Sequence, residues 1–244
     1  MKKSLCVLLC AFVLCFSACG QRDQFNAQDS ASENTTNQES TALPKLHNEY
    51  ALILENIINA YPWNDNDLTM VPENPELSYM YRQNAELSEI GFALLDLDGN
   101  GQEELIISDL NKFVYDVYTI SNDKAVHLFA GGERYCYLLR ENGVVENSWS
   151  GSVPTSGHDF YKLNDGKLEF IERITLDAYH ALDVGVIKEL TEANNDNCFF
   201  ISPTDQFEDY KSVTSDEAIE KIESYQDANK ELEIEYTLLS DYKK

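Results

Sequence analysis

The feature that most constrains the fold is a series of short strand-like segments that begins near residue 90. These segments are rich in aromatic and β-branched residues and span 92–97, 105–108, 113–120, 125–130 and 134–139. The turn sequences Asn142-Gly143 and Asn164-Asp165-Gly166 then separate further strands. Because most neighbouring segments are joined by very few residues, each strand can only reverse and pair with the one before it. The pattern predicts an antiparallel β meander of about 8 to 10 strands.

Helical periodicity lies on both sides of this series. Before it, apolar residues recur at three- and four-residue steps and predict a helix that ends before Pro62. These residues are Leu46, Tyr50, Ile53, Leu54, Ile57 and Tyr61. A shorter helix is predicted over 75–84, with Pro75 in its first turn. Near the C-terminus, Thr214 and Glu217 form a capping box that predicts another helix.

The last part of the chain alternates between apolar and polar residues over 232–238, which predicts a final strand. Residues 176–195 are ambiguous between helix and strand. Together with the meander, these patterns predict an α+β fold. In this fold, helices at the N- and C-terminal ends pack on one antiparallel sheet.

The first eighteen residues have the pattern of a secretory signal peptide. Lys2 and Lys3 give it a positive start, and an apolar stretch follows over 5–16. This stretch is too short to span a bilayer, and no stop-transfer pattern follows it. The sequence therefore predicts an exported protein.

The run Phe16-Ser17-Ala18-Cys19-Gly20 resembles a bacterial lipobox, although Phe16 stands where leucine is usual. The resemblance implies that Cys19 receives a diacylglycerol thioether and becomes the new N-terminus. Two acyl chains suffice for stable anchoring, so the protein would be attached to the extracytoplasmic face of the cell membrane. The alternative is ordinary cleavage after Gly20, which would release a soluble protein.

Residues 20–44 are mostly Gln, Asn, Ser, Thr and acidic residues, with almost no large apolar side chain. Such a segment cannot bury enough apolar surface to become ordered. The predicted organisation is a signal peptide over 1–18, a lipidated cysteine and disordered tether over 19–44, and a single α+β domain over 45–244.

The chain is strongly acidic, with a formal net charge of -25. Removing the signal, which holds two lysines and no acidic residue, changes this charge to -27. A chain of this charge repels phosphate backbones and anionic lipid headgroups, which argues against nucleic acid and against a polybasic membrane contact. The expected partners are the membrane, through the anchor at Cys19, and a surface protein or glycan.

The segment 96–104 has the oxygen donors of a calcium loop. Donors fall at alternate positions, and Gly101 permits the bend that lets them converge on one ion. These donors are Asp96, Asp98, Asn100, the Gln102 carbonyl and Glu104. An EF-hand also needs a bidentate glutamate at position twelve, which is Ile107 here, and its flanks are helices rather than strands.

The loop instead resembles the strand-loop-strand calcium loops of FG-GAP type repeats, with the same five donors at that pattern's ligand positions. A propeller needs several blades and the chain has one such loop, so the resemblance does not extend to that fold. The order of lipobox, polar tether, calcium loop and aromatic hairpins also resembles uncharacterised surface lipoproteins of Gram-positive bacteria, which implies a location. The alternative is a glycine-rich hairpin turn with solvated acids.

Cys136 and Cys198 are the cysteines of the predicted α+β domain. They either form a disulfide, as an exported protein allows, or remain buried thiols. For catalysis, Ser156-Gly157-His158-Asp159 places a hydroxyl, an imidazole and a carboxylate close together in sequence. The alternative for this run is an ordinary hairpin loop.

Four aromatic residues on the predicted hairpins are candidate ligand contacts, because exposed rings can stack on sugars or anchor a protein partner. They are Tyr135, Tyr137, Trp149 and Tyr161. The alternative is that they belong to the core of the sheet. The sequence thus predicts a cell-surface, calcium-stabilised binding or structural module. The second hypothesis is a hydrolase that acts outside the cell on cell-wall or dietary polysaccharide, with carboxylates near the calcium loop or the 156–159 loop.

Overall fold

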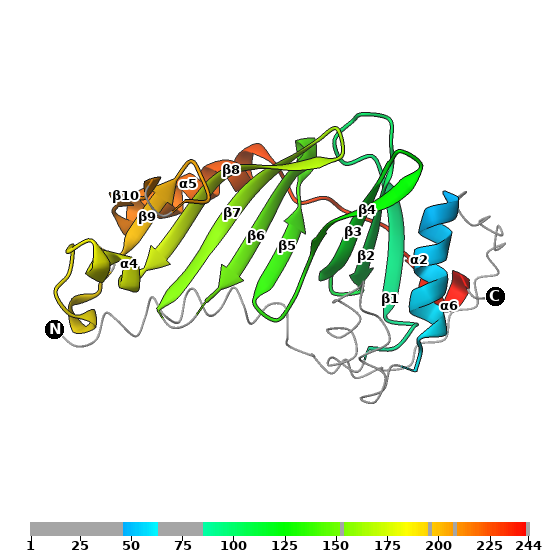
Figure 1. Cartoon of the computed structure of the whole chain (residues 1–244), viewed down its shortest axis with the longest axis horizontal. Coiled ribbons are helices and arrows are strands. Elements are labelled where there is room, and N and C mark those ends of the chain that lie inside the picture. Colours follow the sequence, from blue (N-terminus) through cyan, green and yellow to red (C-terminus); the bar gives the residue numbers. More distant parts are fainter. Residues whose placement is uncertain (1–45, 63–84, 152–153, 195–196, 207–208, 243–244) are drawn as a thin grey trace, which may run out of the picture. The chain divides into compact units, whose positions relative to one another are not determined.

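The computed structural model describes residues 46–62, 85–151, 154–194, 197–206 and 209–242. In this part of the chain, eleven strands and four α-helices form an α+β fold, so the predicted class is confirmed. The strands form two sheets, one of five strands in the order β11-β1-β2-β3-β4 and one of six in the order β10-β9-β8-β7-β6-β5 (Figure 1).

Both sheets are built mainly from hairpins, so that strands adjacent in the chain are also adjacent in the sheet. The first sheet contains β1 (Ile90–Leu95), β2 (Glu104–Asp109), β3 (Val114–Ser121), β4 (Lys124–Ala130) and β11 (Thr237–Leu238). The second contains β5 (Tyr135–Leu139), β6 (Val144–Ser150), β7 (Thr155–Asn164), β8 (Lys167–Asp177), β9 (Phe199–Ser202) and β10 (Lys211–Val213). The antiparallel meander is therefore confirmed.

The meander divides into two sheets, rather than the one expected, between β4 and β5. At this point Gly131 lies against β3, and its N–H donates a hydrogen bond to the Tyr115 carbonyl at 3.0 Å. A Cβ at Gly131 would come within 2.1 Å of the Val114 carbonyl oxygen, which no side chain allows. The chain thus crosses the end of the first sheet, and β5 begins a new sheet instead of pairing with β4.

The predicted hairpin turns are confirmed. Asn142 and Gly143 have φ values of 59° and 65° between β5 and β6, and Asp165 and Gly166 have 50° and 67° between β7 and β8. Successive positive φ values match the right-handed twist of the flanking strands. The turns therefore fix the register of the six-stranded sheet at one end of these two hairpins.

The first helix, α2 (Asn48–Asn59), begins after His47 and buries the predicted stripe, including Tyr50, Leu54 and Ile57. The helix predicted over 75–84 lies outside the described residues. The ambiguous stretch 176–195 contains the end of β8, the short helix α4 (Ala178–Asp183) and a 3-10 turn, η2 (Leu190–Glu192).

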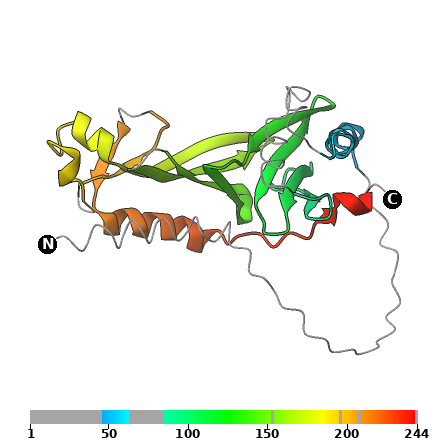
Figure 2. The same ribbon diagram turned by 90° about the horizontal axis from the view of Figure 1, so that it is seen from below.

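The helix α5 (Ser215–Ala228) starts at the predicted capping box, in which Thr214 and Glu217 bond each other's backbone N–H. It lies along one face of the six-stranded sheet (Figure 2). There Tyr225 stacks on Phe160 of β7, with ring centroids 4.1 Å apart. A last helix, α6 (Leu239–Tyr242), follows β11.

The segment between α5 and β11, residues 231–236, crosses from one sheet to the other. At one end the Leu232 N–H bonds the carbonyl of Leu139 in β5, and at the other Leu238 pairs with Gly91 in β1. The final strand is consequently shorter than the predicted 232–238, because the crossing chain cannot pair along its length with either sheet. Its predicted alternation is confirmed, since three apolar side chains pack on the core between the sheets: Leu232, Ile234 and Tyr236.

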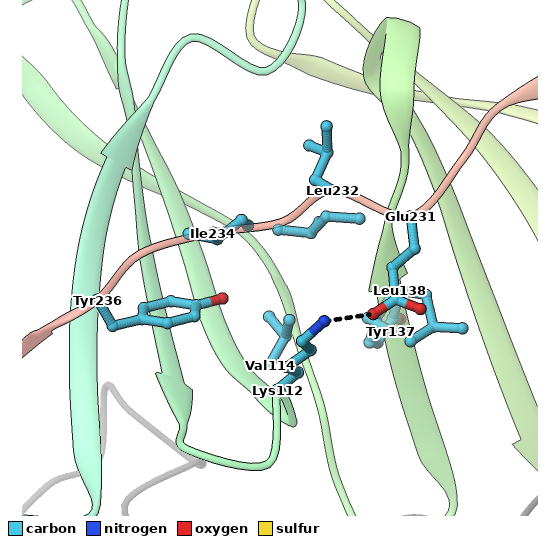
Figure 3. Close-up of a pocket in the computed structure, with 9 residues that line it drawn as sticks. Lys112, Val114, Tyr137, Leu138, Glu231, Leu232, Ile234 and Tyr236 are labelled. Atoms are coloured by element: carbon cyan, nitrogen blue, oxygen red, sulfur yellow. Dashed lines mark ion pairs between the residues drawn. The ribbon is translucent and has the colours of Figure 1, made fainter.

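A small pocket of about 20 Å³ lies beside this crossing segment, where Lys112 faces Glu231 across 3.8 Å (Figure 3). A cavity of this size holds about one water molecule. It is too small to be a ligand site.

The disulfide alternative for Cys136 and Cys198 is contradicted, because the structure contains both as thiols. Cys136 lies in β5 and Cys198 directly precedes β9, with three strands between them in the sheet. Adjacent strands are about 4.8 Å apart, whereas the two Cα atoms of a disulfide lie within about 7 Å. Cys198 is buried, as the alternative of two buried thiols predicts, whereas Cys136 is half-buried.

Candidate functional site

The loop 96–104 connects β1 to β2 and brings three of the predicted ligands together. One carboxylate oxygen each of Asp96, Asp98 and Glu104 lies within 4.8 Å of the others. Glu104 is fully buried, whereas the two aspartates are half-buried. The three oxygens therefore surround one point between the loop and the sheet.

Backbone N–H groups hold the two aspartates in place. Both oxygens of Asp96 accept hydrogen bonds, Oδ1 from Gly99 N at 2.8 Å and Asn100 N at 3.0 Å, and Oδ2 from Gly101 N at 2.9 Å. Asp98 Oδ1 accepts another from Asn100 N at 3.1 Å. Gly101 has a φ of 87°, which is the conformation expected at the bend. The loop is thus a tight turn that points its carboxylates inward.

Glu104 is the first residue of β2, and its carboxylate faces the protein interior. Oε2 accepts a hydrogen bond from Leu97 N at 2.9 Å, and Oε1 accepts one from the Thr119 hydroxyl at 3.0 Å. Burial raises the pKa of Glu104 to about 7, although these two hydrogen bonds act in the opposite direction. Neighbouring Asp96 and Asp98 raise the pKa further, because like charges disfavour ionisation.

The other two predicted ligands belong to the same turn. Asn100 Oδ1 accepts a hydrogen bond from Gln102 N at 2.6 Å, and Asn100 Nδ2 donates to Asp98 Oδ2 at 3.2 Å. The Asn100 side chain thus bonds within the turn itself, and the oxygens that the structure brings together are those of Asp96, Asp98 and Glu104.

The loop also contacts the second sheet and helix α2. Asp98 Oδ2 accepts a hydrogen bond at 3.1 Å from Gly166 N, in the turn between β7 and β8. The Tyr50 hydroxyl of α2 donates to the Glu103 carbonyl at 2.9 Å. Leu97 belongs to the apolar core that side chains of both sheets share. The conformation of this loop therefore affects how the first sheet, the second sheet and helix α2 are held together.

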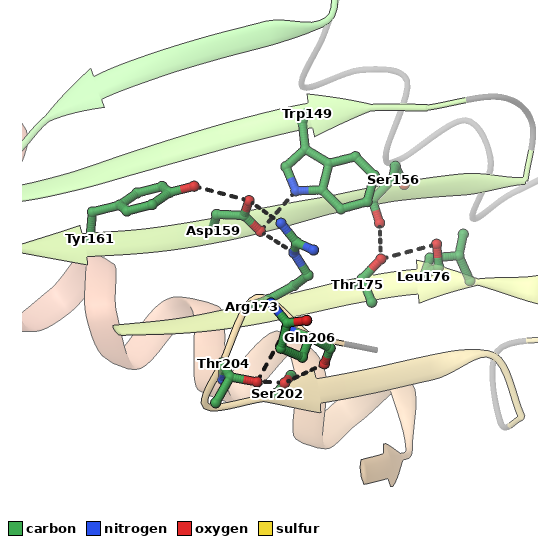
Figure 4. A network of polar contacts seen from close by, with 10 residues as sticks. All are labelled: Trp149, Ser156, Asp159, Tyr161, Arg173, Thr175, Leu176, Ser202, Thr204 and Gln206. Atoms are coloured by element: carbon green, nitrogen blue, oxygen red, sulfur yellow. Dashed lines mark hydrogen bonds and ion pairs between the residues drawn. The ribbon is translucent and has the colours of Figure 1, made fainter. Parts of the chain in front are cut away.

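A second polar cluster lies on one face of the six-stranded sheet and is centred on Asp159 of β7 (Figure 4). Arg173 of β8 bonds both of its carboxylate oxygens, at 2.7 and 2.8 Å. Trp149 Nε1 donates to the same carboxylate at 2.9 Å, and the Tyr161 hydroxyl does so at 3.3 Å. Asp159 is 3% exposed, so a buried carboxylate with four donors fixes the orientation of three side chains.

The four candidate aromatic residues divide into two pairs. Tyr137 stacks on Phe129 at 4.6 Å between ring centroids, and Tyr161 packs with it against the core that joins the sheets. Tyr135 and Trp149 are cross-strand partners near one end of β5 and β6, and Tyr135 is 53% exposed. Tyr137 and Tyr161 thus belong to the core, as the alternative expected, whereas Tyr135 and Trp149 remain candidates for ligand contact.

The run Ser156-Gly157-His158-Asp159 does not form one constellation, because it lies in a strand, where successive side chains point to opposite faces. Asp159 belongs to the cluster with Arg173, whereas His158 bonds Glu146 through Nδ1 at 2.7 Å. These four residues therefore do not form the catalytic group that the hydrolase hypothesis expected.

Glu146 lies on the same face as α5 and is 1% exposed. Arg140 Nε donates to it at 2.7 Å, and Gln226 of α5 donates at 3.1 Å. Burial alone would raise the pKa of Glu146, but the hydrogen bond from His158 and the attraction of His158 and Arg140 hold it below its ordinary value. This network ties α5 and β5 to the centre of the sheet.

Sequence reasoning missed Asp159 and Arg173 as partners. The two residues are fourteen positions apart and meet because β7 and β8 pair in one register, which includes a bulge after Phe160. The available signal was the alternation of Gly157, Asp159 and Tyr161, which places a carboxylate beside an aromatic ring on one face of a strand.

Comparisons with protein-family models, with curated proteins and with solved structures found no match. Within the described residues, none of the helices has the length and apolar character needed to cross a membrane.

Proposed function

We propose that this protein is a lipid-anchored module on the outer side of a cell membrane, with a binding or structural role, in which one calcium ion fixes the β1–β2 hairpin. The ligands are Asp96, Asp98, Asn100, the Gln102 carbonyl and Glu104. The observation that carries the proposal is the convergence of the Asp96, Asp98 and Glu104 oxygens within 4.8 Å.

This spacing suits calcium. A calcium ion binds oxygens at 2.3–2.6 Å, so two ligands on opposite sides of it lie about 5 Å apart. The hydrogen bonds described for the three carboxylates come from neutral N–H and O–H groups. Three carboxylates in one place repel one another, and a divalent cation would reverse the sign of that interaction.

The position of the loop supports a structural role for the ion. The loop bonds the turn between β7 and β8 through Asp98, and α2 through Glu103. An ion that holds Asp98 and Glu104 together would stabilise both the contact with the β7–β8 turn and the contact with α2. Extracellular modules need only weak calcium affinity, with dissociation constants of about 0.1 to 1 mM, because calcium outside cells is abundant.

The anchoring part of the proposal rests on the sequence. The lipobox-like run ending at Cys19, followed by a polar segment over 20–44, supports attachment through two acyl chains. The acidic surface of the chain, with a formal net charge of -25, is compatible with a calcium-rich exterior and unsuited to nucleic acid.

Thermal unfolding in calcium and in chelator tests the calcium site. At a calcium concentration of 10 to 100 times the dissociation constant, mass action stabilises the folded state by about 1.4 to 2.7 kcal/mol. For a domain of this size, we expect the midpoint to rise by roughly 3 to 10 °C. Identical midpoints in the two solutions would contradict the proposal.

Two matched variants make the test specific. Asp98→Asn removes one ligand charge from the loop, and we expect it to lose most of the calcium-dependent shift. Asp123→Asn changes an exposed aspartate with a φ of 59° in the turn between β3 and β4, a conformation that asparagine also tolerates. This control should keep the full shift, so a general effect of surface charge would reveal itself as equal losses in both variants.

A further inference from the structure

The face of the six-stranded sheet opposite α5 carries a group of aromatic and polar side chains. In the part of the chain that the structure describes, no helix lies over β6 and β7 on this side (Figure 2). Strand alternation and register place Tyr135, Asn147, Trp149, Asp159 and Arg173 on this face.

The Trp149 ring lies over Gly157 of the neighbouring strand. A Cβ at Gly157 would come within 2.8 Å of ring atom Cζ2 and 3.1 Å of Cε2, so only glycine leaves room for the ring there. The bond from Nε1 to Asp159 at 2.9 Å fixes the direction of the indole. Trp149 is half-buried, so a ring held against the sheet still exposes part of its surface. It is oriented before any ligand arrives.

Tyr135 extends this surface across the strand pair. It is the register partner of Trp149, so the two side chains are neighbours on one face. It is 53% exposed, so about half of its surface is open to a ligand. The Trp149 ring extends over Gly157 of β7, on the other side of β6 from Tyr135, and the Arg173 guanidinium carbon lies 5.5 Å from its centroid. The two rings therefore offer two separate apolar surfaces of the kind on which the C–H face of a pyranose ring packs.

Asn147 supplies an unsatisfied polar group at the same place. It pairs in register with Tyr137 and Asp159, it is 3% exposed, and its Oδ1 has no hydrogen-bond partner. A buried acceptor without a protein donor is rare in native structures, and an ordered water or a ligand hydroxyl can satisfy it. A hydroxyl group would satisfy it after rotation of the Asn147 amide toward the surface.

The charges of this face favour a neutral ligand. Asp159 and Arg173 form a bidentate pair, so neither offers a net charge to a ligand. The formal net charge of -25 on the chain repels anionic polymers. A molecule with apolar ring faces, many hydroxyl donors and no charge fits these conditions.

We propose that this face binds a neutral oligosaccharide, which stacks on Tyr135 and Trp149 and donates a hydroxyl hydrogen bond to Asn147. The inference rests on the binding role proposed above and names the class of ligand. The site is separate from the calcium loop, so each can be tested without the other.

Fluorescence titration and calorimetry test the proposal with a defined set of probes. The probes are hexasaccharides of β-1,4-linked glucose, xylose, mannose and N-acetylglucosamine, with α-1,4-linked glucose as a fifth and oligogalacturonate as the anionic control. The chain has two tryptophans, so the Trp63→Phe variant leaves Trp149 as the single reporter. We expect at least one neutral probe to change its emission saturably, and oligogalacturonate to leave it unchanged.

Matched variants locate the site. Tyr135→Ala removes an exposed ring and should weaken binding of that probe at least tenfold, with an unchanged melting midpoint. Tyr179→Ala removes a ring that is 43% exposed on α4 and should bind like the parent protein. Equal affinities of these two variants, or no binding of any neutral probe with a dissociation constant below about 10 mM, would overturn the inference.

The same titrations in calcium and in chelator separate the two proposals. Calcium stabilisation without sugar binding would leave the module intact and remove only its glycan ligand, and a surface protein would then be the partner to seek. Sugar binding that requires Tyr135 but is accompanied by no calcium effect on melting would remove the metal site and retain the glycan face.

Discussion

Two groups of buried carboxylates in this domain are stabilised in different ways. In the six-stranded sheet, Glu146 bonds Arg140 and Asp159 bonds Arg173, so each carboxylate has a cation from the chain. At the start of β2, Glu104 is as deeply buried as Glu146 and receives its hydrogen bonds from Leu97 N and the Thr119 hydroxyl.

The pKa values follow this difference. The pKa of Glu104 is raised to about 7, chiefly by burial, whereas that of Glu146 lies below its ordinary value despite burial. The two carboxylates are equally buried, but their pKa values shift in opposite directions. The groups bonded to each carboxylate decide the direction. The sheet carboxylates are electrostatically complete within the chain, and the loop carboxylates gain most from a cation that comes from outside.

The largest effect is expected where an internal cation is removed. Arg140→Met removes one buried cation from Glu146 and leaves His158 as its remaining ionisable partner; the Arg140 side chain is 7% exposed and the Glu146 side chain 1%. Breaking a buried ion pair in this way typically costs about 3 to 5 kcal/mol. We expect a loss of that size in the free energy of unfolding, measured by urea denaturation with intrinsic fluorescence.

Lys162→Met is the control for this change, because it removes a cation from β7 that is only half-buried. It should cost less than about 1 kcal/mol. If Arg140→Met were as mild as the control, the sheet carboxylates would not depend on internal cations and the comparison would fail.

A smaller effect of opposite sign is expected in the loop. Glu104→Gln replaces a buried charge by a neutral amide that can still accept from Leu97 N. In chelator at pH 8, we expect this variant to unfold with a free energy equal to the parent or up to about 1 kcal/mol higher. In calcium, the variant should fall below the parent, since it has lost a ligand charge.

Glu146→Gln is the matched substitution in the sheet. It should destabilise the protein in both solutions, because it leaves Arg140 without its carboxylate. Equal destabilisation by Glu104→Gln and Glu146→Gln in chelator would mean that the loop does not need an external cation.

The sequence predicts those features of the fold that depend on neighbouring residues and leaves others open. Local patterns predicted the hairpins, the burial stripe of α2 and the capping box at Thr214, because each depends on residues only a few positions apart. The convergence of Asp96, Asp98 and Glu104 was predicted for the same reason, since one tight turn contains all three.

The remaining features depend on contacts between distant segments. The division into two sheets requires the close approach of Gly131 to Val114, which no local pattern encodes. The Asp159–Arg173 pair depends on a bulge in the register of β7 and β8. The final strand is short because its two ends belong to different sheets, a constraint that alternation over 232–238 does not contain.

The smallest effect is expected from acid, and it tests the sheet side of the comparison. Because the pKa of Glu146 is lower in the folded state than its ordinary value of 4.5, its ionised form stabilises the folded protein above that pH. This contribution is lost as the pH falls through the folded pKa, when the proton must displace the bonds to Arg140 and His158.

The Glu146→Gln variant has no such proton to bind. Urea denaturation of both proteins, in chelator, should therefore show a difference in unfolding free energy that is present at about pH 5 and narrows below about pH 4.5. A difference that stays constant down to about pH 3 would show that Glu146 gains nothing from its internal cation, and the contrast with Glu104 would then have a different cause.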